Sequence, residues 1–90
     1  MRFEWDPGKA AENLARHGVS FEEAATVFRD VLSATGADPD HSVDEERFVT
    51  FGISTRGGLL AIAHTKGDDT IRIIRARPAT PSERRIYEQG

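Results

Sequence analysis

A short strand-like segment that carries three arginines constrains the fold of this chain more than any other feature. Residues 70–77, TIRIIRAR, are rich in β-branched and apolar side chains, which favours an interior strand. An interior strand seldom carries cations unless they meet acidic partners or bind an anion. Strict alternation places Arg75 and Arg77 on one face of the strand and Arg72 on the other. Only a bulge or a strand end near Ile74 would bring the three arginines together.

Two interpretations of these arginines remain open at this point. They can be structural, each paired with a nearby acid where the strand leaves the core. They can also form a guanidinium cluster for phosphate, because the planar fork of arginine matches phosphate oxygens.

Composition narrows the class of protein. A chain of 90 residues predicts one domain, spanning residues 1–90, with a modest core. The sequence has no cysteine, so disulfides and thiolate metal sites are excluded. No segment resembles a signal peptide or a membrane span, which predicts a cytoplasmic protein without membrane contact.

Charge is distributed unevenly along the chain. The net charge is −3, which argues against a general nucleic-acid binder. Residues 1–70 hold 7 Lys or Arg and 13 Asp or Glu, whereas residues 71–90 hold 5 Arg and 2 Glu. A basic carboxyl end on an acidic protein suits one defined anionic target better than sliding along DNA.

The order of predicted elements indicates an α+β fold. Alternation predicts strands at residues 1–5, 47–54, 59–65 and 70–77, a short strand at 31–35, and an acidic loop at 36–46. Cap signals predict helices that begin after Asp6, Ser20 and Thr80, and end near Gly18, Asp30 and Gln89. The last three strands form an antiparallel meander, packed against two N-terminal helices, with a C-terminal helix after it. In the first helix, Ala10, Ala11, Leu14 and Ala15 are expected to face the core, with Lys9, Asn13, Arg16 and His17 along or beside the polar face.

The candidate chemistry is acid–base and cationic. The three histidines lie on different elements without metal-ligand spacing, which predicts neither a metal nor another cofactor. Arginines can stabilise the charge that develops on a phosphate, and His64 can exchange protons near neutral pH. Other possible proton carriers are Glu46, Lys9, His17 and Tyr87. This set suffices for metal-free RNA cleavage, although His64 can instead be a core histidine and Tyr87 a packing residue.

Several stretches, in order along nearly the whole chain, resemble the BrnT ribonuclease toxins of type II toxin–antitoxin systems. They are FEWD at 3–6, Lys9, Asn13, HGVSFEEA at 17–24, EER at 45–47, Gly52, Leu59-Leu60, His64-Thr65, IRII at 71–74, Ala76-Arg77, ERR at 83–85 and Tyr87. The resemblance implies a RelE-like α+β fold and RNA cleavage that arrests translation. It also implies a complex with a BrnA-type antitoxin, whose ribbon-helix-helix part would make the only contact with DNA.

The resemblance also orders the candidate residues. Phe48 stands where the family usually has Trp, and Arg75 stands where it commonly has Ser. The motif therefore favours Arg47, Arg72 and Arg77 as catalytic cations. His64 is the leading general acid or base, and Arg84 and Tyr87 contribute from the last helix. Candidates for RNA binding alone are Lys9, His17, Arg75 and Arg85. The alternative function is a catalytically inactive module that docks an acidic protein through its basic carboxyl end.

Overall fold

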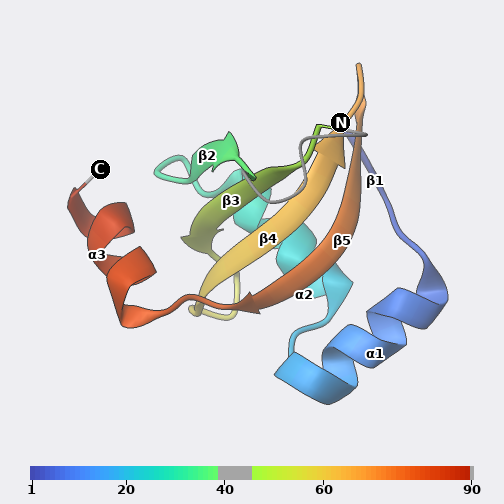
Figure 1. Cartoon of the computed structure of the whole chain (residues 1–90), viewed down its shortest axis with the longest axis horizontal. Coiled ribbons are helices and arrows are strands. Elements are labelled where there is room, and N and C mark those ends of the chain that lie inside the picture. The colour runs from blue at the N-terminus through green and yellow to red at the C-terminus, as the bar shows by residue number, and fades with distance from the viewer. Residues whose placement is uncertain (39–45, 90) are drawn as a thin grey trace.

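A computed structural model describes residues 1–38 and 46–89 of the chain, and Figure 1 shows their arrangement. The elements are β1 (Arg2–Glu4), α1 (Pro7–His17), α2 (Phe21–Thr26), the 3₁₀ helix η1 (Val27–Arg29), β2 (Ala34–Ala37), β3 (Phe48–Ile53), β4 (Leu59–Lys66), β5 (Thr70–Pro78) and α3 (Pro81–Gln89). One five-stranded sheet has the order β1-β5-β4-β3-β2. The α+β class and the antiparallel β3-β4-β5 meander are confirmed. β1 adds a parallel strand at the β5 edge.

The predicted helix starts are confirmed by their caps. The Asp6 carboxylate accepts the Gly8 N–H at 2.7 Å, and the Ser20 hydroxyl accepts the Glu23 N–H at 3.0 Å. Gly18 ends α1 in the left-handed conformation, with φ 71°. Each side-chain cap contributes about 1 kcal/mol to stability. No helix in the part of the chain that the structure describes is long and apolar enough to cross a membrane.

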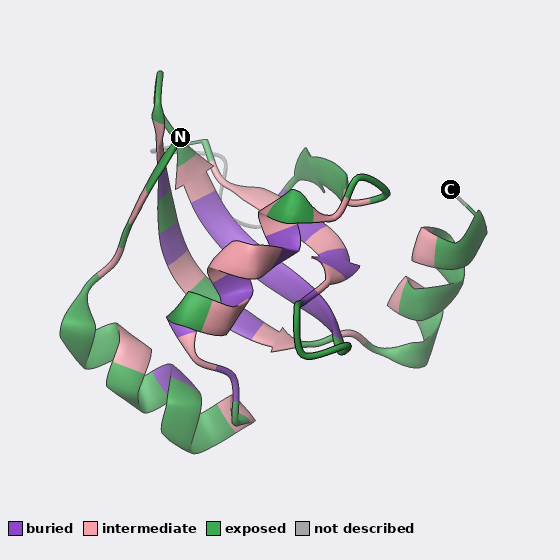
Figure 2. Cartoon of the chain, turned by 180° about the vertical axis from the view of Figure 1, so that it is seen from behind, coloured by how far each residue is buried: buried purple, intermediate pink, exposed green. Residues whose placement is uncertain are grey.

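The core lies between α2 and one face of the sheet. Figure 1 shows α2 behind the sheet, and the view from behind in Figure 2 shows buried strand residues beneath it. Phe21, Ala24 and Val27 pack there in one buried cluster with Ile62 and Ile73. Side chains that point away from α2 form the second face of the sheet, which we call the arginine face for the residues it carries on β5.

A bulge in β5 puts all three arginines on that face. His64 pairs with Ile73 and Ala63 pairs with Arg75, so Ile74 is an extra residue without a partner on β4. Ile71 and Ile73 before the bulge, and Ala76 after it, are buried on the α2 side. Arg72, Arg75 and Arg77 therefore share the arginine face. Strict alternation, which separated Arg72 from the other two, was wrong, because one extra residue reverses the parity of the strand beyond it.

The face that α1 buries differs from the expected one. Asn13, expected beside the polar face, is only 6% exposed, whereas Leu14, expected in the core, is 52% exposed. β1 pairs with β5 only as far as Arg72, so the β5 backbone beyond it needs polar partners on that edge. The helix consequently turns an amide toward β5 and leaves the leucine at the surface.

The strand after η1 begins later than expected. It was predicted at residues 31–35, but β2 comprises Ala34–Ala37, so residues 36 and 37 belong to a strand and not to the loop. The Asp30 carboxylate accepts the Leu32 N–H at 2.9 Å and thereby holds a turn where the strand was expected to start. The rest of the predicted acidic loop falls mainly at residues 39–45, outside the described residues.

Gly52 provides a test of how η1 packs against β3. A Cβ at Gly52 would lie 2.7 Å from Val27 Cγ1 and 3.1 Å from Ser33 Cβ. Gly52→Ala should therefore lower the free energy of unfolding by about 1–3 kcal/mol in urea denaturation. Gly36→Ala is the matched control on β2, because its Cβ would meet no atom within 4 Å. Equal stability of the two variants would contradict the packing of η1 on β3.

Candidate functional site: a basic hollow between α1 and β5

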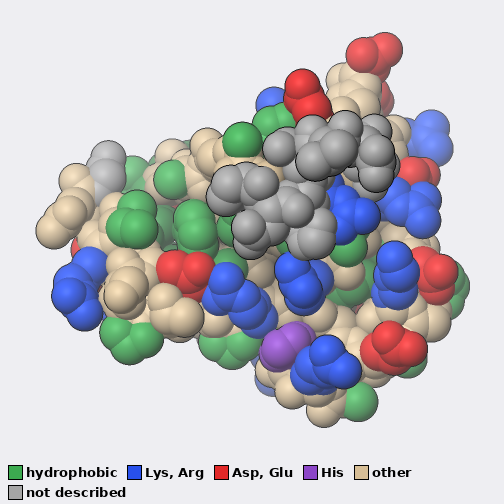
Figure 3. All heavy atoms as spheres, viewed as in Figure 1, with side chains coloured by type: hydrophobic (Ala, Val, Ile, Leu, Met, Phe, Trp, Pro, Cys, Tyr) green, Lys and Arg blue, Asp and Glu red, His purple; other side chains and the backbone are tan. Residues whose placement is uncertain are grey.

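A hollow with a volume of about 240 Å³ lies where α1 meets β5. Its lining is Lys9, Glu12, Asn13, Arg16, His17, Arg47, Ile74 and Arg75. Figure 3 shows Lys and Arg side chains gathered over β5 and α1, with a histidine beside them. Among the described residues, the lining carries four cations and one carboxylate, a composition that would favour an anionic ligand.

Three elements contribute the charges of the hollow. α1 provides Lys9, Arg16 and His17, which its helical period brings to the side facing β5. The negative end of the helix dipole favours the two basic residues in its last turn. Arg75 is the residue directly after the bulge in β5, and Arg47 directly precedes β3. Residues far apart in the sequence thus meet at one basic surface.

Arg72 and Arg77 flank the hollow and are not part of its lining. Arg72 lies 3.8 Å from the Glu4 carboxylate, and both side chains are exposed, so this pair contributes little to stability. Arg77 is held more firmly: it donates two hydrogen bonds to Glu83, at 2.7 and 2.8 Å. The Arg77 guanidinium lowers the pKa of Glu83 to about 2. Arg77 therefore already has an anion in the geometry that a phosphate would require.

His64 lies on the α2 side of the sheet, opposite the arginine face. It is 2% exposed and touches the Phe28 ring edge-on, and its own ring stacks on Phe48. Its Nε2 is 2.7 Å from the Thr50 hydroxyl, and its Nδ1 is 3.1 Å from the Thr65 carbonyl. Burial lowers the pKa of His64, which favours the neutral ring. This position matches the core histidine that was the alternative to a proton carrier.

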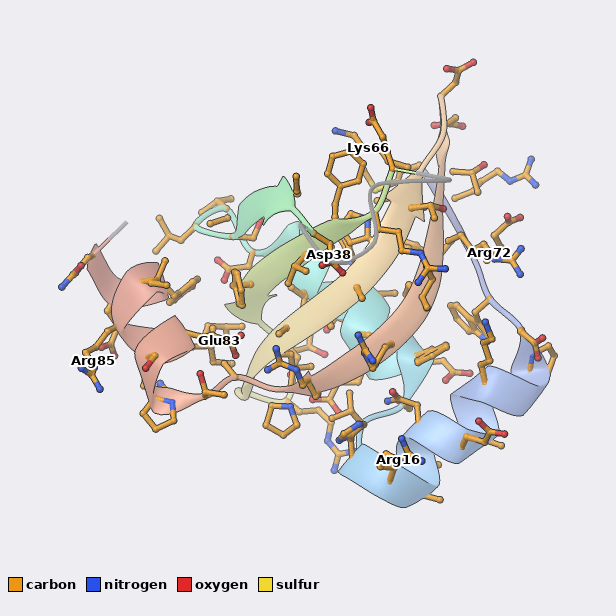
Figure 4. The ribbon with its side chains drawn as sticks, in the orientation of Figure 1. Arg16, Asp38, Lys66, Arg72, Glu83 and Arg85 are labelled. Carbon is orange, nitrogen blue, oxygen red and sulfur yellow. The ribbon has the colours of Figure 1, made fainter. Side chains whose placement is uncertain are left out.

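The candidates on α3 are also outside the hollow. The Tyr87 hydroxyl donates to the Asp30 carboxylate at 2.6 Å, which raises the pKa of Tyr87, and Asp30 also accepts the Ile53 N–H at 2.8 Å. These bonds fasten α3 beside β3. Arg84 and Arg85 are exposed on the same helix. In Figure 4, Arg85 on α3 lies well to the left of Arg16 on α1.

Arg16 and Glu12 complete the hollow but were absent from the expected site. Helical spacing already placed Arg16 close to Lys9 and His17, and this was the available signal. The sequence does not say, however, that α1 packs along the end of β5. In residues 1–38 and 46–89, no three His, Asp or Glu side chains come close enough to share a metal ion.

The Arg77–Glu83 pair provides a test of how α3 is attached. Glu83→Gln should lower the free energy of unfolding at pH 7 by about 1–2 kcal/mol, a value discounted because both side chains are partly exposed. The pKa of Glu83 falls from an ordinary 4.5 to about 2, so this stabilisation is present above pH 4.5 and lost as the pH falls toward 2. Wild type and variant should therefore converge in acid. Glu88→Gln removes the same charge from an exposed position of α3 and should have little effect at either pH.

Comparisons with known proteins identify a solved structure with a similar fold. No curated protein matches the sequence. The crystal structure of the Brucella abortus ribonuclease toxin BrnT is similar, with a TM-score of 0.66 and 26% identity, over 89% of this chain and 97% of that one. Residues 5–83 match the family model described as "Ribonuclease toxin, BrnT, of type II toxin-antitoxin system". The chain therefore belongs to the BrnT family of ribonuclease toxins.

Proposed function

We propose that this chain is an endoribonuclease toxin that cleaves RNA without a metal ion and binds it in the basic hollow. The observation that carries the proposal is the meeting of Lys9, Arg16, Arg47 and Arg75 with one imidazole, that of His17, in a single hollow. Membership of the BrnT family supports the reaction class. The hollow supplies cations and a proton carrier, the two kinds of group that metal-free RNA cleavage needs.

The reaction is an internal phosphoryl transfer. A base takes the proton of a ribose 2′-hydroxyl, whose oxygen attacks the adjacent phosphorus while the bond to the 5′-oxygen breaks. An acid protonates that leaving oxygen, so the products are a 2′,3′-cyclic phosphate and a 5′-hydroxyl. His17 is the proposed proton carrier, with Lys9 about two helical turns away on the same face of α1. Arg47 and Arg75 neutralise the negative charge that grows on the phosphate oxygens.

This proposal changes the ranking of the arginines. The family motif favours Arg72 and Arg77, whereas the geometry favours Arg75, which lines the hollow together with the proposed proton carrier. Arg77 would first have to release Glu83, and Arg72 lies farther along the arginine face beside Glu4. We therefore propose that both arginines contact RNA nucleotides on either side of the cleaved phosphate.

The remaining expected candidates receive other roles. His64 and Tyr87 are structural, since their polar atoms are engaged with Thr50 and Asp30 away from the hollow. Arg84 and Arg85 on α3 lie away from the hollow and serve at most as distant contacts for RNA.

The proposed partner is an antitoxin of the BrnA type. The family belongs to type II toxin–antitoxin systems, in which a protein neutralises the toxin. An acidic segment of that protein would complement the basic hollow and exclude RNA from it. The proposal also includes a RelE-like fold and a cytoplasmic location. Contact with DNA would be made only through a ribbon-helix-helix segment of the antitoxin.

The second candidate function is an inactive binding module. The same cations would then bind an acidic protein without cleaving RNA. The Glu12 carboxylate beside these cations is compatible with a partner whose surface carries charges of both signs. Cleavage of RNA by the purified chain distinguishes the two functions.

Purified protein should cut single-stranded RNA in the presence of EDTA. The products should carry 2′,3′-cyclic phosphate and 5′-hydroxyl ends, because the nucleophile is the neighbouring 2′-hydroxyl. Mass spectrometry of the fragments identifies the ends, and RNA with 2′-O-methyl riboses is the uncleavable control. Activity that disappears in EDTA and returns with a divalent cation would refute the metal-free mechanism, and intact RNA in every condition would favour the binding module.

Substitutions in the hollow should abolish most of the activity while the protein remains folded. Arg75→Ala and His17→Ala should each lower kcat by about 10²–10³-fold, the usual cost of a lost charge contact or proton carrier. Arg85→Ala and His64→Gln are the matched controls: the first should keep its activity, and the second should lose stability but keep its activity. If the His64 variant is as stable as wild type but cleaves no RNA, while the His17 variant remains active, then His64 and not His17 is the proton carrier.

A further inference from the structure

We infer that Asn13 is a positioning residue that holds Arg75 in register with the cations of α1. The inference rests on the proposed function, because it concerns the geometry of the same hollow. Nothing in the residue type alone suggests it, since an asparagine in mid-helix is ordinarily a solvent-facing residue.

The contacts of Asn13 tie three segments together. Its Nδ2 donates to the Ala76 carbonyl at 2.8 Å and to the Val19 carbonyl at 2.9 Å. Its Oδ1 accepts the Ala76 N–H at 3.1 Å. The side-chain amide thus supplies both a donor and an acceptor to one residue of β5, as the backbone of a neighbouring strand would.

This clamp lies where the strand is least constrained by its neighbours. On the β1 side, pairing of β5 ends at Arg72; on the β4 side, the ladder is interrupted at Ile74. A bulge weakens the local ladder and bends the strand. Asn13 binds Ala76, two residues beyond the bulge. These hydrogen bonds therefore hold the strand directly after the residue at which the alternation of its side chains changes.

The same clamp sets the distance between the two walls of the hollow. Lys9 and His17 lie four residues before and after Asn13, one turn away on either side along the same face of α1. Arg75 immediately precedes Ala76. The amide therefore joins the middle of one wall to the base of the other. Arg77, on the far side of Ala76, has an independent anchor in Glu83.

A double-mutant cycle tests the inference. Asn13→Ala should lower kcat for RNA cleavage by about 10–100-fold, because small misplacements of a charge ligand are costly, while KM changes by less than about threefold since every cation remains. In the Arg75→Ala background, the same change should cost less than about threefold, because Asn13 acts through Arg75. In the Arg77→Ala background the full effect should persist. Asn13→Gln, which retains the amide, should recover part of the activity.

Val27→Ala controls for stability, because it opens the core beneath α2 on the opposite side of the sheet. All variants are assayed well below their melting temperatures. An equal loss of kcat in Val27→Ala, or the same loss from Asn13→Ala with and without Arg75, would overturn the inference and leave the proposed function intact.

Affinity for RNA with 2′-O-methyl riboses separates the two claims. If wild type binds this RNA but cleaves no RNA, the proposed function fails, and the cycle is then evaluated on affinity. A loss of affinity in Asn13→Ala that disappears in the Arg75→Ala background supports the positioning role, and additive losses refute it. Wild type that neither binds nor cleaves RNA refutes both.

Discussion

The irregular pairing of β4 with β5 at Ile74 is the constraint on which the rest of this molecule depends. One extra residue in β5 leaves Ile71, Ile73 and Ala76 on the buried side, although they are not in strict alternation. The same residue turns three guanidinium groups to the opposite face. A regular strand would bury Arg75 and Arg77 beneath α2, at a desolvation cost that no packing there would offset.

Polar contacts hold β5 beyond the bulge. On the β1 side, the strand loses its backbone partner after Arg72, and α1 supplies an amide from Asn13 in its place. Toward the carboxyl end, Arg77 meets Glu83 and fixes the start of α3. Polar contacts thus help to join α1 and α3 to the sheet, whereas α2 contributes Phe21 and Ala24 to the apolar core. The Asn13 contact lies at the candidate site, so stability and the proposed function share a residue there.

The two histidines in the described part of the chain show how burial separates similar side chains. His64 is enclosed by aromatic rings, and its burial lowers the pKa of the ring, which favours the neutral form; hydrogen bonds to Thr50 and Thr65 satisfy both nitrogens in the core. His17 lies at the end of α1, on the wall of a hollow lined with cations. Both were candidates from the sequence, because residue type gives proton-transfer capacity and says nothing of the face of the sheet on which a side chain lies.

The sequence by itself determined the elements, their order and the family. Caps at Asp6, Ser20 and Thr80, and alternation in the last three strands, are local signals, and local energies are sufficient to place them. Only the tertiary structure decided which side chains meet. The bulge arises from pairing between strands, and the burial of Asn13 in preference to Leu14 arises because β5 lacks a backbone partner there. The hollow needs α1, β5 and Arg47 in contact, and such long-range packing leaves no periodic signal in the chain.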